Sequence, residues 1–172
     1  MKLLKLFNLE NLSESEINNL PKRTTTRAVI QNEQGKIALL YSNKFDYHEI
    51  PGGAVDEGET LEQGMIRECL EETGCNVEII AELGLTQGLR PYNNYYQLND
   101  SYGYFVKKIG GIQENNFDED EIEENFELVW VTLEKAIELF NELPTTDNNF
   151  RNYIKERGLL FLNQVKNHRS SE

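Results

Sequence analysis

The amino-acid sequence predicts a single domain of the α+β class, in which strands and helices share one hydrophobic core. The chain of 172 residues has the length of one domain and is long enough to bury such a core. Runs rich in β-branched residues alternate with segments of helical periodicity. Neither an internal repeat nor a linker interrupts this alternation, so one mixed domain is expected.

The beginning of the chain is predicted to be an extension of this domain. Residues 1–22 form the N-terminal extension, and residues 23–172 form the main domain. Within the extension, the sequence at 13–16 is typical of a helix start, and Pro21 would end that short helix.

The elements of the main domain follow from local composition. β-Branched and aromatic runs predict strands at residues 24–30, 36–41, 76–89, 95–109 and 126–131. Thr132 is positioned to cap a helix at 133–141. A second C-terminal helix is expected from residue 147 onward, and Gly158 is interpreted as a break in it.

A helix preceded by a glycine-containing loop is the best-marked element of the chain. Thr60 is a predicted N-cap, Gln63 completes a capping box, and Gly74 is placed as the left-handed C-terminal stop. Between them an apolar stripe is expected to face the core; its members are Leu61, Met65, Ile66, Cys69 and Leu70. The helix is therefore predicted to form from local signals alone.

The charge balance limits the classes of partner. The chain has 30 acidic and 17 basic residues, for a formal net charge of -13. Such a charge repels the backbone of a nucleic-acid polymer, so polymer binding is disfavoured. A small anionic substrate remains compatible, because a bound Mg²⁺ ion can reverse the local potential.

The two cysteines, and the lack of a long apolar segment, predict a cytoplasmic protein. Cys69 and Cys75 match no zinc spacing and no disulfide framework, so they are interpreted as small buried hydrophobes in a reducing compartment. The start of the chain is too short in apolar residues for a signal peptide, and no segment suits a membrane span. No membrane partner is expected.

Three carboxylates on the central helix predict a metal site. Glu68, Glu71 and Glu72 are spaced so that Glu68 lies on the same helical face as the other two. Crowded like charges repel each other, and a hard divalent cation with oxygen ligands removes the conflict. Mg²⁺ is the usual cation where phosphates are substrates, and Mn²⁺ is the alternative.

The loop and helix together carry charged and glycine residues at a fixed spacing: Gly53, then five residues, Glu59, seven residues, Arg67-Glu68, two residues, Glu71-Glu72, one residue and Gly74. This spacing resembles the Nudix box, the signature of the Nudix hydrolase family. Cys69 and Cys75 stand where the family prefers bulky aliphatic residues. The resemblance implies an α/β/α sandwich with a mixed sheet between helices, a Nudix domain over residues 23–172, and hydrolysis of a diphosphate linked to another group.

The resemblance also implies roles for individual residues. The metal ligands would be Glu68, Glu71, Glu72 and the backbone carbonyl of Gly52. Arg67 and Glu59 would orient this face through a salt bridge. The general base that activates water lies in the box helix in some members and in a later loop in others. Glu124 is the favoured candidate here, and Glu121 and Glu68 are the alternatives.

The substrate is expected to be a small nucleotide. Arg27 and Lys44 flank the approach to the box loop and are candidate phosphate ligands, and Arg90 and Tyr92 are candidates to clamp a base. The preferred reading is a MutT-like pyrophosphohydrolase acting on a nucleoside triphosphate or a damaged one. The alternatives are an ADP-ribose or other nucleoside-diphosphate-X hydrolase, and a nucleotide-sensing Nudix domain without turnover. A homodimer is possible, as in many family members.

Overall fold

A mixed β-sheet is the centre of the computed structural model, which describes residues 1–117 and 119–171 except the side chains of residues 120 and 121. In this part of the chain the seven strands run in the order β1-β5-β6-β2-β3-β4, and β7 pairs with β3. The strands are β1 (Leu3–Phe7), β2 (Lys22–Gln31), β3 (Ile37–Ser42), β4 (Tyr47–Glu49), β5 (Cys75–Tyr92), β6 (Tyr95–Ile112) and β7 (Phe126–Val131). The helices are α1 (Glu14–Asn18), α2 (Leu61–Thr73), α3 (Glu119–Glu124), α4 (Leu133–Glu142) and α5 (Asn149–Arg169).

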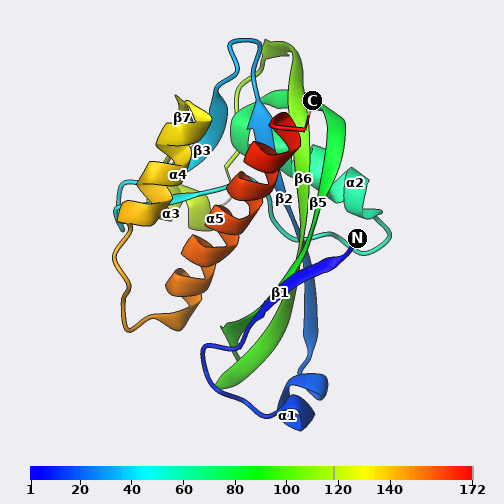
Figure 1. Cartoon of the computed structure of the whole chain (residues 1–172), viewed down its shortest axis with the longest axis vertical. Coiled ribbons are helices and arrows are strands. Elements are labelled where there is room, and N and C mark those ends of the chain that lie inside the picture. The colour runs from blue at the N-terminus through cyan, green and yellow to red at the C-terminus, as the bar shows by residue number, and fades with distance from the viewer. Residues whose placement is uncertain (118, 172) are drawn as a thin grey trace.

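Helices cover both faces of the sheet. Helix α2 packs against β2 and β5, whereas α5 packs against α4 and across β5 (Figure 1). The alternation of side chains along β2 explains the two layers, because Val29 belongs to the core under α4 and α5 while Ala28 and Ile30 belong to the core under α2. The predicted α+β class, with a mixed sheet between helices, is confirmed.

Helix α2 begins and ends where the sequence predicted. The Thr60 side chain accepts from the Gln63 amide in a complete capping box, and Gly74 has φ 65° at the C-terminal end. A side chain at Gly74 would collide with the carbonyl of Gln113, so glycine is required for packing as well as for the turn. The apolar stripe is narrower than predicted, since Ile66 is 41% exposed.

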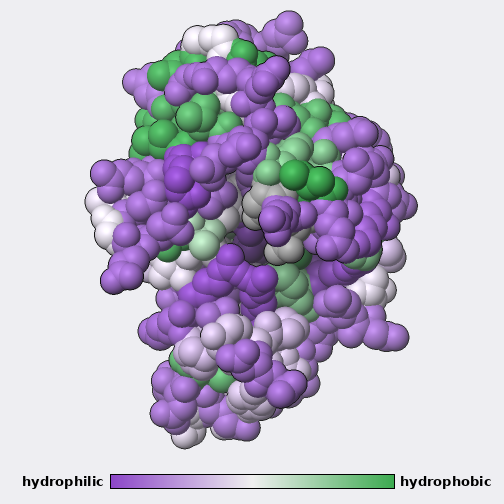
Figure 2. Space-filling view, turned by 180° about the vertical axis from the view of Figure 1, so that it is seen from behind, coloured by the Kyte–Doolittle hydropathy of each residue, from purple (hydrophilic) through white to green (hydrophobic). Residues whose placement is uncertain are grey.

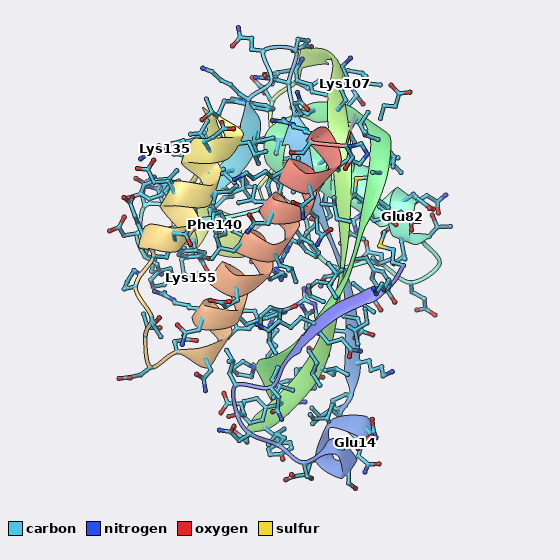
Figure 3. The ribbon with its side chains drawn as sticks, viewed as in Figure 1. Glu14, Glu82, Lys107, Lys135, Phe140 and Lys155 are labelled. Atoms are coloured by element: carbon cyan, nitrogen blue, oxygen red, sulfur yellow. The ribbon has the colours of Figure 1, made fainter. Side chains whose placement is uncertain are left out.

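Helix α5 is continuous from Asn149 to Arg169, so the predicted break at Gly158 is wrong. Gly158 is buried, and the ring of Phe140 on α4 occupies the space that a side chain there would need. Figure 3 labels Phe140 where α4 faces α5. The glycine thus allows the two helices to approach closely, and its helical propensity cost of about 1 kcal/mol is offset by this contact.

The first 22 residues are part of the same sheet and core. Strand β1 pairs in parallel with β5, from Leu3 opposite Leu85 to Phe7 opposite Gly88. The predicted short helix is confirmed as α1, which Ser13 caps. Its Ile17 and the following Leu20 pack in a small cluster with Leu89 and Leu98 at one end of the long β5–β6 hairpin.

The acidic segment before β7 is helical, since residues 119–124 form α3. Within the described residues, no helix combines the length and the apolar character that crossing a membrane requires.

Candidate active site

One polar cavity of about 420 Å³ collects most of the residues singled out by the sequence. Its lining comes from strands β2 to β7, the loop after β4, the segment between β6 and α3, α2, α3 and the first half of α5. Figure 2 shows a face of the molecule that is hollowed near its middle, with strongly hydrophilic residues around the hollow. The cavity has two chemically distinct parts, one lined by carboxylates and the other by arginines.

The loop before α2 is held against β2 like a further strand. The Thr26 amide donates to the carbonyl of Gly53 at 2.9 Å, and the Ala28 amide donates to the carbonyl of Pro51 at 2.8 Å. Gly52 has φ 130°, and a side chain there would collide with the backbone of β2. Only glycine therefore allows the loop to lie this close to the strand.

The same loop also approaches the carboxylates of α2. A Cβ atom on Gly53 would lie 2.5 Å from both carboxylate oxygens of Glu68. The Gly52 amide donates to Oε2 of Glu72 at 2.6 Å, and Glu72 is only 5% exposed. We call Glu68, Glu71 and Glu72 the carboxylate wall of the cavity.

Arg67 ties the carboxylate wall together. Its Nε and Nη2 atoms donate to the two oxygens of Glu59 at 2.9 and 3.0 Å. Its Nη1 atom donates to Glu68 and to Glu71, each at 2.9 Å, and Nη2 also donates to the carbonyl of Ala54. The bidentate bond from Arg67 lowers the pKa of Glu59 to about 2, and these carboxylates in turn raise the pKa of Arg67.

The carboxylate wall suits a hard divalent cation. Burial raises the pKa of Glu68 above its ordinary value, although Arg67 opposes this, so the charged form is under electrostatic strain that a cation would relieve. Among the described residues no three such ligand side chains already converge for a metal ion, and Glu68 and Glu71 bond to Arg67. The donor set is nevertheless made of carboxylate oxygens at one wall, which is what Mg²⁺ or Mn²⁺ prefers.

Glu124 reaches the same cavity from the end of α3. The hydroxyl of Tyr47 donates to Oε2 of Glu124 at 2.9 Å, and the Glu124 carbonyl accepts from the Lys44 amide at 3.2 Å. Burial, with Glu49 and Glu124 nearby, raises the pKa of Tyr47, so this hydroxyl keeps its proton and stays a donor. The side chain of Glu121, the alternative candidate, lies outside the described residues.

Arginines form the other part of the cavity, which we call the arginine end. Its members are Arg23, Arg27, Arg90 and Arg157. Arg27 and Arg157 share one oxygen of Glu49, with Nη2 to Oε1 distances of 3.0 and 2.5 Å. Arg157 is 1% exposed, and burial lowers its pKa. The ring of Phe150 lies 5.7 Å from the Arg90 guanidinium.

The cavity gathers most but not all of the predicted site residues. Those that line it are Arg27, Gly52, Arg67, Glu68, Glu71, Glu72, Arg90 and Glu124. Glu59 acts through Arg67 and does not line the cavity. Lys44 pairs with Glu123 on the surface, and Tyr92 lies at the turn between β5 and β6, so the structure does not bring these two to the cavity. Their role in substrate binding stays a prediction.

Sequence reasoning missed Arg157, Glu49 and Arg23. An arginine in a C-terminal helix ordinarily lies on the surface, and nothing in the Arg157 position alone says otherwise. The available signal was its neighbour Gly158, within a segment that also carries Tyr153 and Ile154. A glycine in the interior of a helix indicates close packing, and close packing buries the residues beside it.

The fold and the cavity define a protein with a Nudix box at a polar cleft, and comparison with known proteins agrees. The family model for the NUDIX domain matches residues 21–155. The chain therefore belongs to the Nudix family.

Individual relatives match only part of the chain. A protein of Bacillus subtilis (strain 168) named "Putative 8-oxo-dGTP diphosphatase" is 39% identical over 59 residues, which are 34% of this chain and 40% of that one. An "RNA pyrophosphohydrolase" of Roseobacter denitrificans is 30% identical over 89 residues, 51% of this chain and 56% of that one. The chain thus spans between two fifths and somewhat over half of the length of these two curated relatives.

A solved structure supports the fold. The NUDIX hydrolase from Nitrosomonas europaea superimposes with a TM-score of 0.61 at 16% identity, covering 87% of this chain and 90% of that one. At this level of identity the likeness concerns the fold alone.

Proposed function

We propose that the protein is a divalent-metal-dependent pyrophosphohydrolase that cleaves nucleoside triphosphates, normal or damaged. The observation that carries this proposal is the composition of one cavity, where a carboxylate wall and an arginine end lie together. A polyphosphate needs both parts, because a cation held by carboxylates neutralises one section of its charge and arginines neutralise another.

The metal ligands would be Glu68, Glu71 and Glu72, with the carbonyl of Gly52. Mg²⁺ is the expected ion and Mn²⁺ the alternative. When bound, such an ion polarises phosphoryl oxygens, neutralises the leaving group and lowers the pKa of a bound water. Arg67 holds Glu68 and Glu71 in place, and Glu59 in turn fixes Arg67, so these two residues keep the ligands from separating.

Glu124 is the proposed general base. Its carboxylate lines the cavity and is oriented by the Tyr47 hydroxyl at 2.9 Å, which leaves the other oxygen to take a proton from the attacking water. A positioned base contributes about 10²- to 10⁴-fold to the rate. Glu68 remains the alternative within the cavity, and Glu121 the alternative on α3.

Arg27 and Arg90 are the proposed substrate ligands, since both line the cavity. Arg27 is within electrostatic reach of Glu68, where it contributes to that residue's pKa, so it can neutralise a phosphoryl group next to the metal. Arg90, stacked with Phe150, offers a planar surface to a base or a phosphate. Lys44 and Tyr92 have no such place in the cavity.

The alternatives differ in the group beyond the diphosphate. The substrate of an ADP-ribose or nucleoside-diphosphate-X hydrolase has a neutral sugar at that position. A sensor domain would bind the nucleotide without turnover. The name of the Roseobacter relative, "RNA pyrophosphohydrolase", adds RNA as a further substrate class. The net charge of -13 opposes binding of a long polymer, so the triphosphate of a small nucleotide is preferred.

A substrate panel tests this proposal. The protein is assayed with Mg²⁺ and then Mn²⁺ on dGTP, 8-oxo-dGTP, ADP-ribose, UDP-glucose, diadenosine tetraphosphate and a 5′-triphosphorylated RNA oligonucleotide, and kcat/KM is compared. Triphosphates should be cleaved best. Absence of hydrolysis across the panel, with nucleotide binding retained, would favour the sensor reading.

The metal assignment is tested by Glu72→Gln, which removes a buried carboxylate of the wall. Turnover should fall by at least about 10²-fold and Mg²⁺ affinity should weaken, because second-shell and ligand changes cost 10- to 100-fold or more. Glu62→Gln, an exposed carboxylate on the same helix, is the matched control and should behave as wild type. Near-normal turnover in Glu72→Gln would contradict the ligand set.

The base assignment is tested by Glu124→Gln. The kcat value should fall by about 10²- to 10⁴-fold while Mg²⁺ affinity, measured by calorimetry, stays unchanged. Glu121→Gln is the comparison on the same helix, and a larger loss there would move the base to Glu121.

The compartment and the assembly stay predictions. Cys69 and Cys75 are both buried free thiols, which fits the expected cytoplasmic location. The family resemblance allows a homodimer as well as a monomer, and size-exclusion chromatography with light scattering would distinguish the two.

A further inference from the structure

We infer that the arginine end of the cavity is an anion subsite for a phosphoryl group other than the diphosphate held at the carboxylate wall. The inference deepens the proposed function and rests on it. It assigns a substrate-binding role to Arg23 and to Arg157, which Glu49 holds in place, and it makes the charge of the substrate the basis of selection.

The first argument is the charge imbalance. The arginine end contains the four guanidinium groups of Arg23, Arg27, Arg90 and Arg157, but among the described residues only one carboxylate, that of Glu49, bonds to any of them. Among the residues that the structure describes, Arg23 and Arg90 form no ion pair. The surplus positive charge is gathered at one cavity, so an anion that enters is attracted.

The second argument is the cost of burying Arg157. A buried cation is expensive unless charged and polar partners compensate it, and Arg157 is 1% exposed. Its Nη2 atom bonds to Glu49, but Arg27 uses the same carboxylate oxygen, so one negative charge is divided between two cations. A bound phosphoryl group would supply the missing charge.

The third argument is the fixed network behind Arg157. The hydroxyl oxygen of Ser101 lies 3.3 Å from Nη1 of Arg157, 2.8 Å from the Thr25 hydroxyl, 2.9 Å from Nδ2 of Asn99 and 3.1 Å from the Tyr153 hydroxyl. All of these residues are buried. The network leaves the guanidinium little freedom to turn away from the cavity, which is the preorganisation that anion binding requires.

The fourth argument is a pair of buried polar atoms without partners. Within the described part of the chain, Nε of Arg27 donates to nothing and Oδ1 of Asn99 accepts from nothing, although both residues line the cavity. An unsatisfied buried polar atom costs about 1–3 kcal/mol, and a water, an ion or a ligand group is the partner that such an atom requires. A phosphoryl oxygen is one acceptor that suits Arg27, and a nucleotide hydroxyl or N–H group is one donor that suits Asn99.

These observations identify the class of substrate by its charge. A nucleotide sugar has a neutral group beyond its diphosphate. It would leave Arg23 without an anion and Arg157 with only the carboxylate of Glu49, which it shares with Arg27. A third phosphoryl group satisfies them, whether it comes from the triphosphate chain itself or from a phosphate elsewhere on the nucleoside. The shared chemistry is one phosphoryl group in addition to the diphosphate that is cleaved.

Binding without metal tests the subsite directly. Calorimetry in the presence of EDTA, with pyrophosphate and tripolyphosphate as probes, should detect binding to the wild-type protein. Arg157→Lys and Arg23→Gln should each weaken it by about 10- to 100-fold, because each removes a charge-assisted hydrogen bond. Arg169→Gln, a change of the same charge at the far end of α5, is the matched control and should bind as wild type.

Two outcomes of this titration would overturn the subsite. One is an absence of binding by folded wild-type protein at millimolar probe. The other is an equal loss in Arg169→Gln, which would show that only the overall charge matters. Thermal unfolding checks that Arg157→Lys is folded, and Arg23→Gln tests the subsite independently because its side chain is partly exposed.

Kinetics with Mg²⁺ separate the two sources of the phosphoryl group and the two proposals. Wild type and Arg23→Gln are compared on ATP, on adenosine 3′-phosphate 5′-diphosphate and on UDP-glucose. The variant should lose at least about tenfold in kcat/KM on the phosphoryl-rich substrate that uses the subsite and less than twofold on UDP-glucose. Equal losses on all three would overturn the subsite, whereas arginine-dependent probe binding without hydrolysis of any substrate would overturn only the proposed function.

Discussion

Two clusters of charge at the same cavity are built from the same groups in opposite proportions. At the carboxylate wall one guanidinium, that of Arg67, bonds to the carboxylates of Glu59, Glu68 and Glu71. At the arginine end the guanidinium groups of Arg27 and Arg157 share the single carboxylate of Glu49. One cluster has an excess of negative charge, and the other an excess of positive charge.

The sign of the residual charge determines which ligand each cluster can bind. A pair of opposite charges in equal number is satisfied by itself, and its contribution to stability is often near zero. An unequal cluster keeps a residual charge that only a ligand can neutralise. The two excesses have opposite sign and face one cavity, so a metal–polyphosphate complex fits both at once.

The largest expected effect comes from removing the shared carboxylate of the arginine end. Glu49→Gln leaves Arg27 and the buried Arg157 without their anion, and breaking a buried pair in this way costs about 3–5 kcal/mol. Urea denaturation should show this loss. Added pyrophosphate should restore part of it, whereas Mg²⁺ should not; an identical loss with and without pyrophosphate would contradict the comparison.

A smaller effect is expected at the carboxylate wall. Arg67→Gln leaves three carboxylates unpaired, but the Arg67 side chain is 27% exposed, so water compensates part of the loss and about 1–3 kcal/mol is expected. Here Mg²⁺ should stabilise the variant more than it stabilises wild type, because a divalent cation replaces the lost one. Rescue by pyrophosphate rather than by Mg²⁺ would show that the two clusters are not distinguished by charge.

The smallest effect concerns the acid end of the pH range. Arg67 lowers the pKa of Glu59 from an ordinary value of 4.5 to about 2 in the folded protein. A lowered pKa means that the ion pair stabilises the fold above pH 4.5 and loses this contribution as the pH falls toward 2. The difference in unfolding free energy between wild type and Glu59→Gln should therefore be constant between pH 5 and 7 and shrink below pH 4.

Urea denaturation at a series of pH values measures this difference. Glu57→Gln, an exposed carboxylate of the same loop, serves as the control. A difference that does not change between pH 5 and pH 3 would mean that the Arg67 bond does not control the charge of Glu59.

The sequence predicted best those elements whose structure depends on residues within the element or directly beside it. Helix α2 has Thr60 at one end and Gly74 at the other, both within a few residues of the backbone groups that they satisfy. Strands such as β2 and β7 follow from β-branched and aromatic runs for the same reason. Because the carboxylate wall lies on α2, its grouping followed from helical spacing.

What the sequence could not predict depends on contacts between distant segments. Arg157 is 108 positions from Glu49, and their meeting requires α5 to lie across the sheet as one continuous helix. Gly158 was interpreted as a break because the ring of Phe140 that fills its space belongs to another element. Lys44 has the right charge for a phosphate ligand, but its side chain pairs with Glu123 on the surface.

Because β1 pairs in parallel with β5, removing the beginning of the chain would affect the folded domain. The match to the NUDIX domain begins at residue 21, yet the ring of Phe7 lies 5.4 Å from that of Tyr153, whose hydroxyl bonds to Ser101 behind Arg157. A chain shortened to begin at residue 21 would retain the whole Nudix box but lose this contact. It would also uncover the edge of β5 at Leu85–Gly88, where unpaired backbone groups invite association with a second chain. Trimming would therefore first affect the arginine end and the solubility of the protein, well away from the signature that identifies the family.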